Sequence, residues 1–202
     1  MTADLIRLGK KCNQNCLFCT AKEGSVDELK TQEVKDKIKF LVKHNTDILA
    51  FTGGEPTIRE DIIELIKYSK KLGVERIELQ TNAVVLSNKS KAKEFISAGV
   101  DHFFIALHSH KERISNYLTQ SKGFSKTIKG IKNILSFKKS VQLSHVINSK
   151  NYEDLVSFCK YIYLNFNKKV SLYFGFVRPY ASAWENKFII PKLCMTEPYL
   201  NH

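Results

Sequence analysis

The chain has 202 residues, of which 43% are hydrophobic and 26% charged, so it fits one folded domain and excludes a disordered or collagen-like protein. Lysine and arginine exceed aspartate and glutamate by 32 to 20, a formal charge of +12 that raises the question of an anionic partner such as nucleic acid. No apolar run reaches the ~18 residues of a membrane-spanning helix, so no membrane partner is expected. The N-terminal residues resemble no export signal, and we expect a cytoplasmic location.

Alternating strand and helix patterns run along the whole chain. Short apolar runs predict six strands: Leu5–Leu8, Ile48–Thr52, Arg76–Gln80, His102–Leu107, Val141–Ile147 and Val170–Val177. Apolar residues at helical spacing predict five helices between them: one after Thr31, one that ends before Gly73, one from about Ser87 to Ala98, one along Phe124–Leu135 and one along Tyr152–Cys159. Strands separated by helices predict an α/β fold with a parallel sheet, either open or curled into part of a barrel.

Three of the five cysteines, Cys12, Cys16 and Cys19, lie within eight residues, which is not the layout of a disulfide framework. Soft sulfur ligands so close together indicate zinc or an iron–sulfur cluster. Both sites usually take four protein ligands, and no nearby Cys or His supplies a fourth here. An incompletely ligated iron would therefore be open to a ligand that is not protein. Of the other cysteines, Cys159 is expected to be a buried thiol on an apolar helix face, and Cys194 an incidental one.

Unusual polar residues follow the predicted strands at their carboxyl ends, where parallel βα proteins place their chemistry. The cysteine segment follows the first strand. Later strands are followed by Thr52-Gly53-Gly54-Glu55-Pro56, Thr81-Asn82, His108-Ser109-His110, Asn148 and Arg178-Pro179. We therefore expect all of these residues to line one mouth of the fold.

The cysteine spacing, with Phe18 just before Cys19, resembles the signature of radical S-adenosylmethionine (radical SAM) enzymes. The stretch Gly53–Pro56 after the second strand resembles the second motif of that family, and the six βα units match its partial barrel. The resemblance covers most of the chain, from about residue 4 to about residue 178. It implies a partial (βα)6 TIM-like barrel built from parallel strands.

The resemblance also implies the cofactors. Cys12, Cys16 and Cys19 would ligate three irons of a 4Fe–4S cluster, and the amino and carboxylate groups of S-adenosylmethionine (SAM) would ligate the fourth. Reductive cleavage of SAM would give a 5′-deoxyadenosyl radical that abstracts a substrate hydrogen, with a reductant such as flavodoxin or ferredoxin. The implied cofactor-binding residues are Phe18, Gly53, Gly54, Glu55, Pro56, Asn82, His108 and Val177.

Each of these residues has an expected role. The glycine backbone and the Glu55 carboxylate would accept hydrogen bonds from the SAM ammonium, and Pro56 would fix the turn. Asn82 and His108 would contact cofactor or substrate, and Val177 would flank the adenine. Many relatives have a cofactor-binding serine where this chain has Ala106.

Two residues are candidates for a direct catalytic role. His108 either acts on the substrate or is only a polar residue at a strand end. Arg178 either binds a substrate carboxylate or phosphate, or pairs with a neighbouring acid.

The basic residues concentrate between residues 111 and 140. This segment contains eight lysine or arginine residues and a single acidic residue, Glu112. Lys126, Lys129 and Lys132 lie on a predicted outer helix, and most of this charge is expected to be solvated. Only Lys111, Arg113 and Lys122 are placed to meet a polyanion at the mouth. Nucleic acid is therefore a possible partner but not the favoured one.

The resemblance implies a radical SAM core domain over residues 1–179 and a short C-terminal segment over residues 180–202, which is interpreted as the start of a truncated last helix or of an extension. Because the chain shows no substrate-specific motif, the substrate is an expectation from resemblance alone. It is a peptide or protein, with a small molecule as a further partner class. The alternatives are RNA modification and a non-catalytic iron–sulfur or redox protein with a degenerate barrel.

Overall fold

The computed structural model describes residues 3–22, 27–166 and 170–200. Its strands are β1 (Asp4–Arg7), β2 (Ile48–Thr52), β3 (Arg76–Thr81), β4 (His102–Ala106), β5 (Ser140–Ile147) and β6 (Val170–Phe176). Its helices are α1 (Thr31–Lys43), α2 (Ile62–Lys71), α3 (Lys89–Ala98), α4 (Glu112–Thr119), α5 (Phe124–Ser136), α6 (Leu155–Phe166), α7 (Ser182–Glu185) and α8 (Leu193–Thr196). All six predicted strands and all five predicted helices are confirmed, with boundaries shifted by a few residues.

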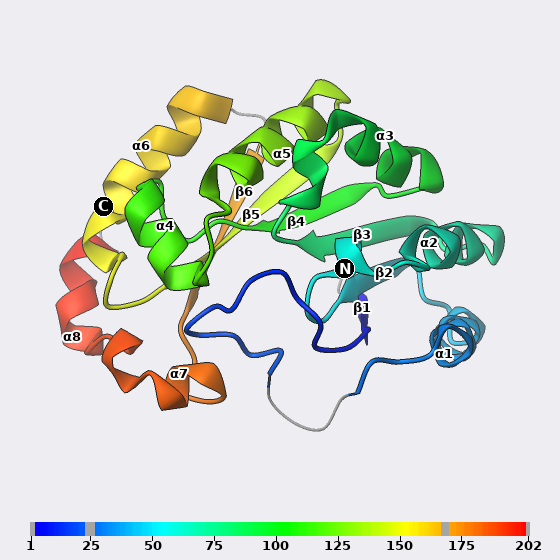
Figure 1. Cartoon of the computed structure of the whole chain (residues 1–202), viewed down its shortest axis with the longest axis horizontal. Helices are drawn as coiled ribbons and strands as arrows, with labels where there is room; N and C mark the ends of the chain where they lie inside the picture. The colour runs from blue at the N-terminus through cyan, green and yellow to red at the C-terminus, as the bar shows by residue number, and fades with distance from the viewer. Residues whose placement is uncertain (1–2, 23–26, 167–169, 201–202) are drawn as a thin grey trace.

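The strands form one parallel sheet in the order β1-β2-β3-β4-β5-β6, so β1 and β6 are the edges. Figure 1 shows α1, α2, α3, α5 and α6 in an arc around this sheet, with the dark blue loop after β1 on the other side from α3 and α5. An open parallel sheet with helices along one side is an incomplete βα barrel, as predicted.

The two faces of the sheet differ in chemistry. On the face under the helices, the paired residues Phe51, Leu79 and Phe103 are all fully buried, and so is the neighbouring pair Leu49 and Ile77. On the other face, Glu78 lies beside His102 and Gln80 lies beside Phe104. The alternation of a parallel strand thus leaves a more polar inner face, below the mouth of the barrel.

Helix α6 corrects one expectation. The predicted apolar face included Val156 and Cys159, but both are exposed, and Cys159 is not a buried thiol. The helix instead turns Phe158 and Ile162 toward the sheet. The larger ring of Phe158 buries more apolar area than a thiol at the same depth, which explains the rotation.

Helix α4 was not predicted, although Ile114 and Leu118 have helical spacing and Glu112 is favourable in its first turn. None of the helices in the described part of the chain is long and apolar enough to cross a bilayer.

Candidate functional site

The cysteine segment is held by the end of α4. The backbone N–H of Asn15 donates to the carbonyl of Thr119 at 3.0 Å, and that of Leu17 donates to Leu118 at 3.0 Å. The last carbonyls of a helix have no partner within the helix, so they are free to accept these bonds. The missed helix is therefore one support of the segment between Cys12 and Cys19.

The glycine pair after β2 supports the start of the same segment. The N–H of Gly54 donates to Gly9 at 2.9 Å, and the N–H of Glu55 donates to Lys11 at 2.9 Å. A Cβ on Gly54 would lie 2.0 Å from the Lys11 carbonyl oxygen, and Gly53 has a φ of +137°, which favours glycine. The close backbone approach that these glycines allow in this structure is to residues 9–11.

The Glu55 carboxylate is buried and accepts four hydrogen bonds from protein groups. The donors are the Asn82 N–H at 2.7 Å, the Thr81 hydroxyl at 2.6 Å, and both the N–H and the hydroxyl of Thr57. Burial raises the pKa of Glu55, although the hydrogen bonds from Asn82, Thr57 and Thr81 oppose it. The carboxylate thus connects the Gly53–Pro56 loop to the end of β3. Its expected contact with the SAM ammonium stays a prediction.

Asn82 extends this network to the cysteine segment. Its side-chain amide donates to the Asn13 side-chain oxygen at 2.6 Å, and its own oxygen accepts from the N–H of Val84 at 3.0 Å. Asn13 is the residue after Cys12, so the end of β3 sets the position of the first cysteine. A role of Asn82 toward cofactor or substrate stays a prediction.

The three thiols are near enough to affect one another. Burial, followed by the neighbouring Cys19 and Cys12, raises the pKa of Cys16 to about 12. The described residues include no group of three Cys, His, Asp or Glu side chains gathered closely enough to hold a metal ion. Cysteines of an iron–sulfur cluster bind different irons, so their sulfurs stay farther apart than the ligands of one ion. The three thiols lie in one segment, and Cys19 and Cys12 raise the pKa of Cys16, as neighbouring ligands of one centre would.

An apolar cluster lies against the cysteines. It buries Phe18, Leu118, Val177, Ala183 and Ile189, and Cys16 packs against it. Phe18 and Val177, which come from opposite edges of the sheet, are thereby brought together. Such a cluster excludes water from one side of the cysteine segment.

His108 joins this cluster through its ring. The rings of His108 and Phe18 meet edge to face with centroids 4.7 Å apart, and the N–H of Val146 donates to His108 Nδ1 at 3.1 Å. Nδ1 is therefore the acceptor, and the ring proton is on Nε2. Burial, with a smaller effect of His145, lowers the pKa of His108 to about 3. The ring is neutral at physiological pH and offers a hydrogen-bond donor at Nε2.

The remaining predicted residues lie at the periphery or in turns. Arg178 is exposed just beyond β6, and its guanidinium donates to the Tyr180 hydroxyl at 3.4 Å. Pro56 is buried and begins a short 3-10 turn, Pro56–Ile58. Cys194 is exposed. The C-terminal segment contacts the site, because the Asn186 side chain donates to the Leu17 carbonyl at 3.3 Å.

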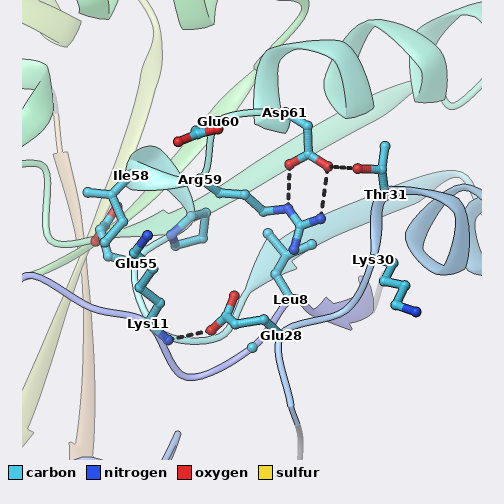
Figure 2. A pocket seen from close by; sticks show the side chains of 13 residues that line it. Leu8, Lys11, Glu28, Lys30, Thr31, Glu55, Ile58, Arg59, Glu60 and Asp61 are labelled. Carbon is cyan, nitrogen blue, oxygen red and sulfur yellow. Dashed lines mark hydrogen bonds and ion pairs between the residues drawn. The ribbon is translucent and has the colours of Figure 1, made fainter.

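A cavity of about 520 Å³ lies beside the Gly54–Pro56 loop and the residues before Cys12. Figure 2 shows the Arg59 guanidinium facing the Asp61 carboxylate, which also accepts from the Thr31 hydroxyl at 2.6 Å. Although burial raises the pKa of Asp61, the bonds from Arg59 and Thr31 lower it below its ordinary value. Glu28 accepts from the backbone N–H of Lys11 at 2.6 Å. These pairs join the loops to α1 and α2.

Sequence reasoning did not assign the groups that position the site. Asn13 and the Thr57 and Thr81 hydroxyls are common polar residues, and their value comes from meeting one carboxylate or one amide. A buried carboxylate needs hydrogen-bond donors. Polar residues at the ends of the neighbouring strands could therefore have been predicted as its partners.

Comparison with known proteins identifies the family of the chain. The family model of the Radical SAM superfamily matches residues 6–162. A probable GTP 3',8-cyclase from Saccharolobus solfataricus is 31% identical over 156 residues, which cover 76% of this chain and 50% of that protein. The chain thus spans about half the length of the curated relatives it matches.

Solved structures agree in fold. SuiB of Streptococcus suis bound to S-adenosylmethionine has a TM-score of 0.75 at 18% identity, over 98% of this chain and 46% of SuiB. SuiB bound to its precursor peptide SuiA has a TM-score of 0.73 at 20% identity, over 98% of this chain and 44% of that one. At these identities the likeness is one of fold alone.

Proposed function

Because this chain belongs to the Radical SAM superfamily, whose members use a 4Fe–4S cluster and SAM, we propose that it is the catalytic core of an enzyme that cleaves SAM reductively. The observation that carries the proposal is the anchoring of the cysteine segment. Backbone bonds from the Gly54–Glu55 loop, the Asn82 amide and the carbonyl end of α4 all converge on residues 9–17.

We assign Cys12, Cys16 and Cys19 as the cluster ligands. When bound there, the cluster and SAM would supply reductive cleavage of a carbon–sulfur bond and, through it, hydrogen abstraction from the substrate. The high pKa of Cys16 means that its thiol must lose a proton when it binds iron. The apolar cluster around Phe18 and Leu118 shields this region from water.

For SAM we assign the backbone of Gly53 and Gly54, with Phe18, His108 and Val177 along the side that faces the end of β6. The Glu55 carboxylate already accepts four hydrogen bonds, so we assign the ammonium contact to backbone carbonyls and give Glu55 and Pro56 positioning roles. Asn82 positions Cys12 through Asn13. Neutral His108 donates from Nε2, and this donor suits a carboxylate or ribose oxygen.

The partners are a one-electron reductant, of the flavodoxin or ferredoxin type, and a substrate that enters from the mouth. We propose a peptide, protein or small-molecule substrate. SuiB has been solved with a precursor peptide, and the archaeal relatives are named for GTP, so relatives support both classes.

The test is anaerobic reconstitution with iron and sulfide, followed by reduction with SAM present. We expect about four irons and four sulfides per chain and the release of 5′-deoxyadenosine. Cys16→Ala should lose the cluster spectrum and the product, whereas Cys159→Ala, which removes an exposed cysteine on α6, should keep both. Stoichiometric zinc binding with no cluster would overturn the proposal.

A further inference from the structure

A second cleft, of about 430 Å³, lies between α4 and the turn after β5. Its lining residues are Arg113, Ile114, Tyr117, Ser149 and Lys150. Two of these are cations from different elements, and none is a carboxylate. The lining of the cleft is therefore positively charged. It contains no carboxylate that would repel a bound anion.

The acidic residues close in sequence to these two cations, Glu112, Glu153 and Asp154, each accept a hydrogen bond from another residue. Asp154 pairs with Lys111 at 2.7 Å, and Glu112 accepts from the Asn116 side chain at 3.5 Å. Within residues 3–22, 27–166 and 170–200, neither Arg113 nor Lys150 forms an ion pair. Both cations are thus available to a ligand.

The C-terminal segment holds the turn that carries Lys150. The Ser149 hydroxyl donates to the Phe188 carbonyl at 2.6 Å, and its N–H donates to Ile189 at 2.9 Å. The Lys150 ammonium lies 5.7 Å from the centroid of the Phe188 ring. A cation held by packing loses less conformational freedom when it binds a ligand.

The cleft adjoins the cysteine site through α4. Ile114, which lines the cleft, packs against the apolar cluster that contains Phe18, and the far end of the same helix accepts the Asn15 and Leu17 amides. A group bound between Arg113 and Lys150 is therefore connected to the cysteine segment by one short helix. The position suits an anchor for part of a substrate whose reacting end lies at the mouth.

We propose that this cleft binds a phosphate group of the substrate. This inference rests on the proposed function, which supplies the reaction that the substrate undergoes. A phosphate carries close to two negative charges and three acceptor oxygens, and so can engage both cations and the Tyr117 hydroxyl at once. The guanidinium fork of Arg113 matches phosphate oxygens, and Lys150 acts as a point charge. A single carboxylate has fewer oxygens for three donors.

The experiment measures the binding of inorganic triphosphate and of GTP to the reconstituted full chain by isothermal titration calorimetry under anaerobic conditions. We expect Arg113→Gln and Lys150→Gln each to weaken binding roughly tenfold. The matched control is Lys126→Gln, which removes an exposed lysine on α5 outside the cleft and should leave the dissociation constant unchanged. Equal binding by all three variants, or no binding by the wild type, would overturn the proposal.

Further ligands identify the source of the phosphate. An RNA oligonucleotide with a 5′-triphosphate that binds more tightly than GTP, through the same two residues, would support the phosphate site and assign it to RNA. An acidic peptide that displaces triphosphate and depends more strongly on Arg113 would overturn it in favour of a carboxylate.

Formation of 5′-deoxyadenosine by the wild type is measured in parallel. A wild type that cleaves SAM but binds no triphosphate refutes only the cleft. A wild type that binds triphosphate in the cleft but forms no cluster refutes the proposed function and leaves the phosphate site supported.

Discussion

The ends of β2 and β3 differ from the ends of β4 and β5 in how they bury a titratable side chain. At the first pair, Glu55 accepts four hydrogen bonds from Thr57, Thr81 and Asn82. At the second pair, His145 is 1% exposed, and its Nδ1 lies 3.1 Å from the Leu107 carbonyl, while its Nε2 has no hydrogen-bond partner among the described residues. Its ring packs instead on Phe158, with centroids 4.2 Å apart.

The difference bears on how the start of the cysteine segment, up to Asn13, is held. Hydrogen bonds are directional, so the Glu55 network fixes the angle and distance of each loop it joins. The packing of rings around His145 depends less on their exact orientation. It fills the space between the sheet and α6 without fixing the angle of a loop. The Glu55 network thus positions Cys12 through Asn82 and Asn13. The side after β4 holds the later residues Asn15 and Leu17 through the last carbonyls of α4.

Replacing Gly54 by alanine should have the largest effect. Its new Cβ would lie 2.0 Å from the Lys11 carbonyl oxygen, which is backbone and cannot rotate away. We expect a loss of about 4 kcal/mol or more in the free energy of unfolding, and little iron after reconstitution. Chemical denaturation and iron analysis measure both.

The matched glycine is Gly175 in β6, at the packed side of the mouth. A Cβ there would meet the Tyr173 ring at an ordinary 3.4 Å, so Gly175→Ala should change stability by less than about 1 kcal/mol. If both variants load iron equally well, the Gly54 contact does not position the cysteines.

Glu55→Gln should have the next largest effect. The amide keeps the size of the side chain but turns two N–H groups toward donors that need an acceptor, which costs about 3 kcal/mol. SAM affinity and iron content should fall with it, because the loops shift relative to each other. Glu60→Gln, an exposed carboxylate in the same loop, is the control and should retain wild-type values. Wild-type iron content in Glu55→Gln would contradict the positioning role.

The six strands, the five predicted helices and the parallel sheet could be predicted from the sequence because each depends on local patterns. Apolar periodicity predicts elements, and parallel strands bring their carboxyl ends together. The spacing from Cys12 to Cys19 indicates a metal centre on chemistry alone.

What the sequence did not reveal depends on the orientation of elements. The face of α6 that packs on the sheet has Phe158 and Ile162 at its centre, and a rotation of about 100° per residue separates this face from the one expected to contain Cys159. The four bonds of Glu55 require knowledge of which loops meet. Such contacts follow from packing between distant segments, which periodicity does not encode.

A smaller effect should appear as a pH dependence of stability at the packed side. Burial lowers the folded-state pKa of His145 to about 4, below the unfolded value of about 6.5, although its bond to the Leu107 carbonyl opposes this. The unfolded chain then binds more protons as the pH falls below about 6.5, so the histidine costs stability there. Between pH 7 and pH 5 we expect His145 by itself to contribute a loss of about 2 kcal/mol.

The comparison is wild type against His145→Gln, measured by denaturant unfolding at both pH values. The variant lacks this titration, so the stability difference between the two proteins should change by about the same 2 kcal/mol in its favour at pH 5. A constant difference would show that His145 is protonated alike in both states, and that the packed side accommodates charge as well as the Glu55 side does.

Cys159→Ser should have the smallest effect, and it tests the rotation of α6 directly. A thiol buried in an apolar core would lose packing and gain an unpaired hydroxyl on this change, at a cost of about 2 kcal/mol. Because Cys159 is exposed at the rim of a cavity that Phe174 and Leu155 also line, the hydroxyl can reach water. The expected change is therefore within about 0.5 kcal/mol, with the cluster unaffected. A larger loss in thermal unfolding would mean that α6 presents Cys159 to the sheet after all, which would move Phe158 away from His145 and remove the ring packing that distinguishes this half of the mouth.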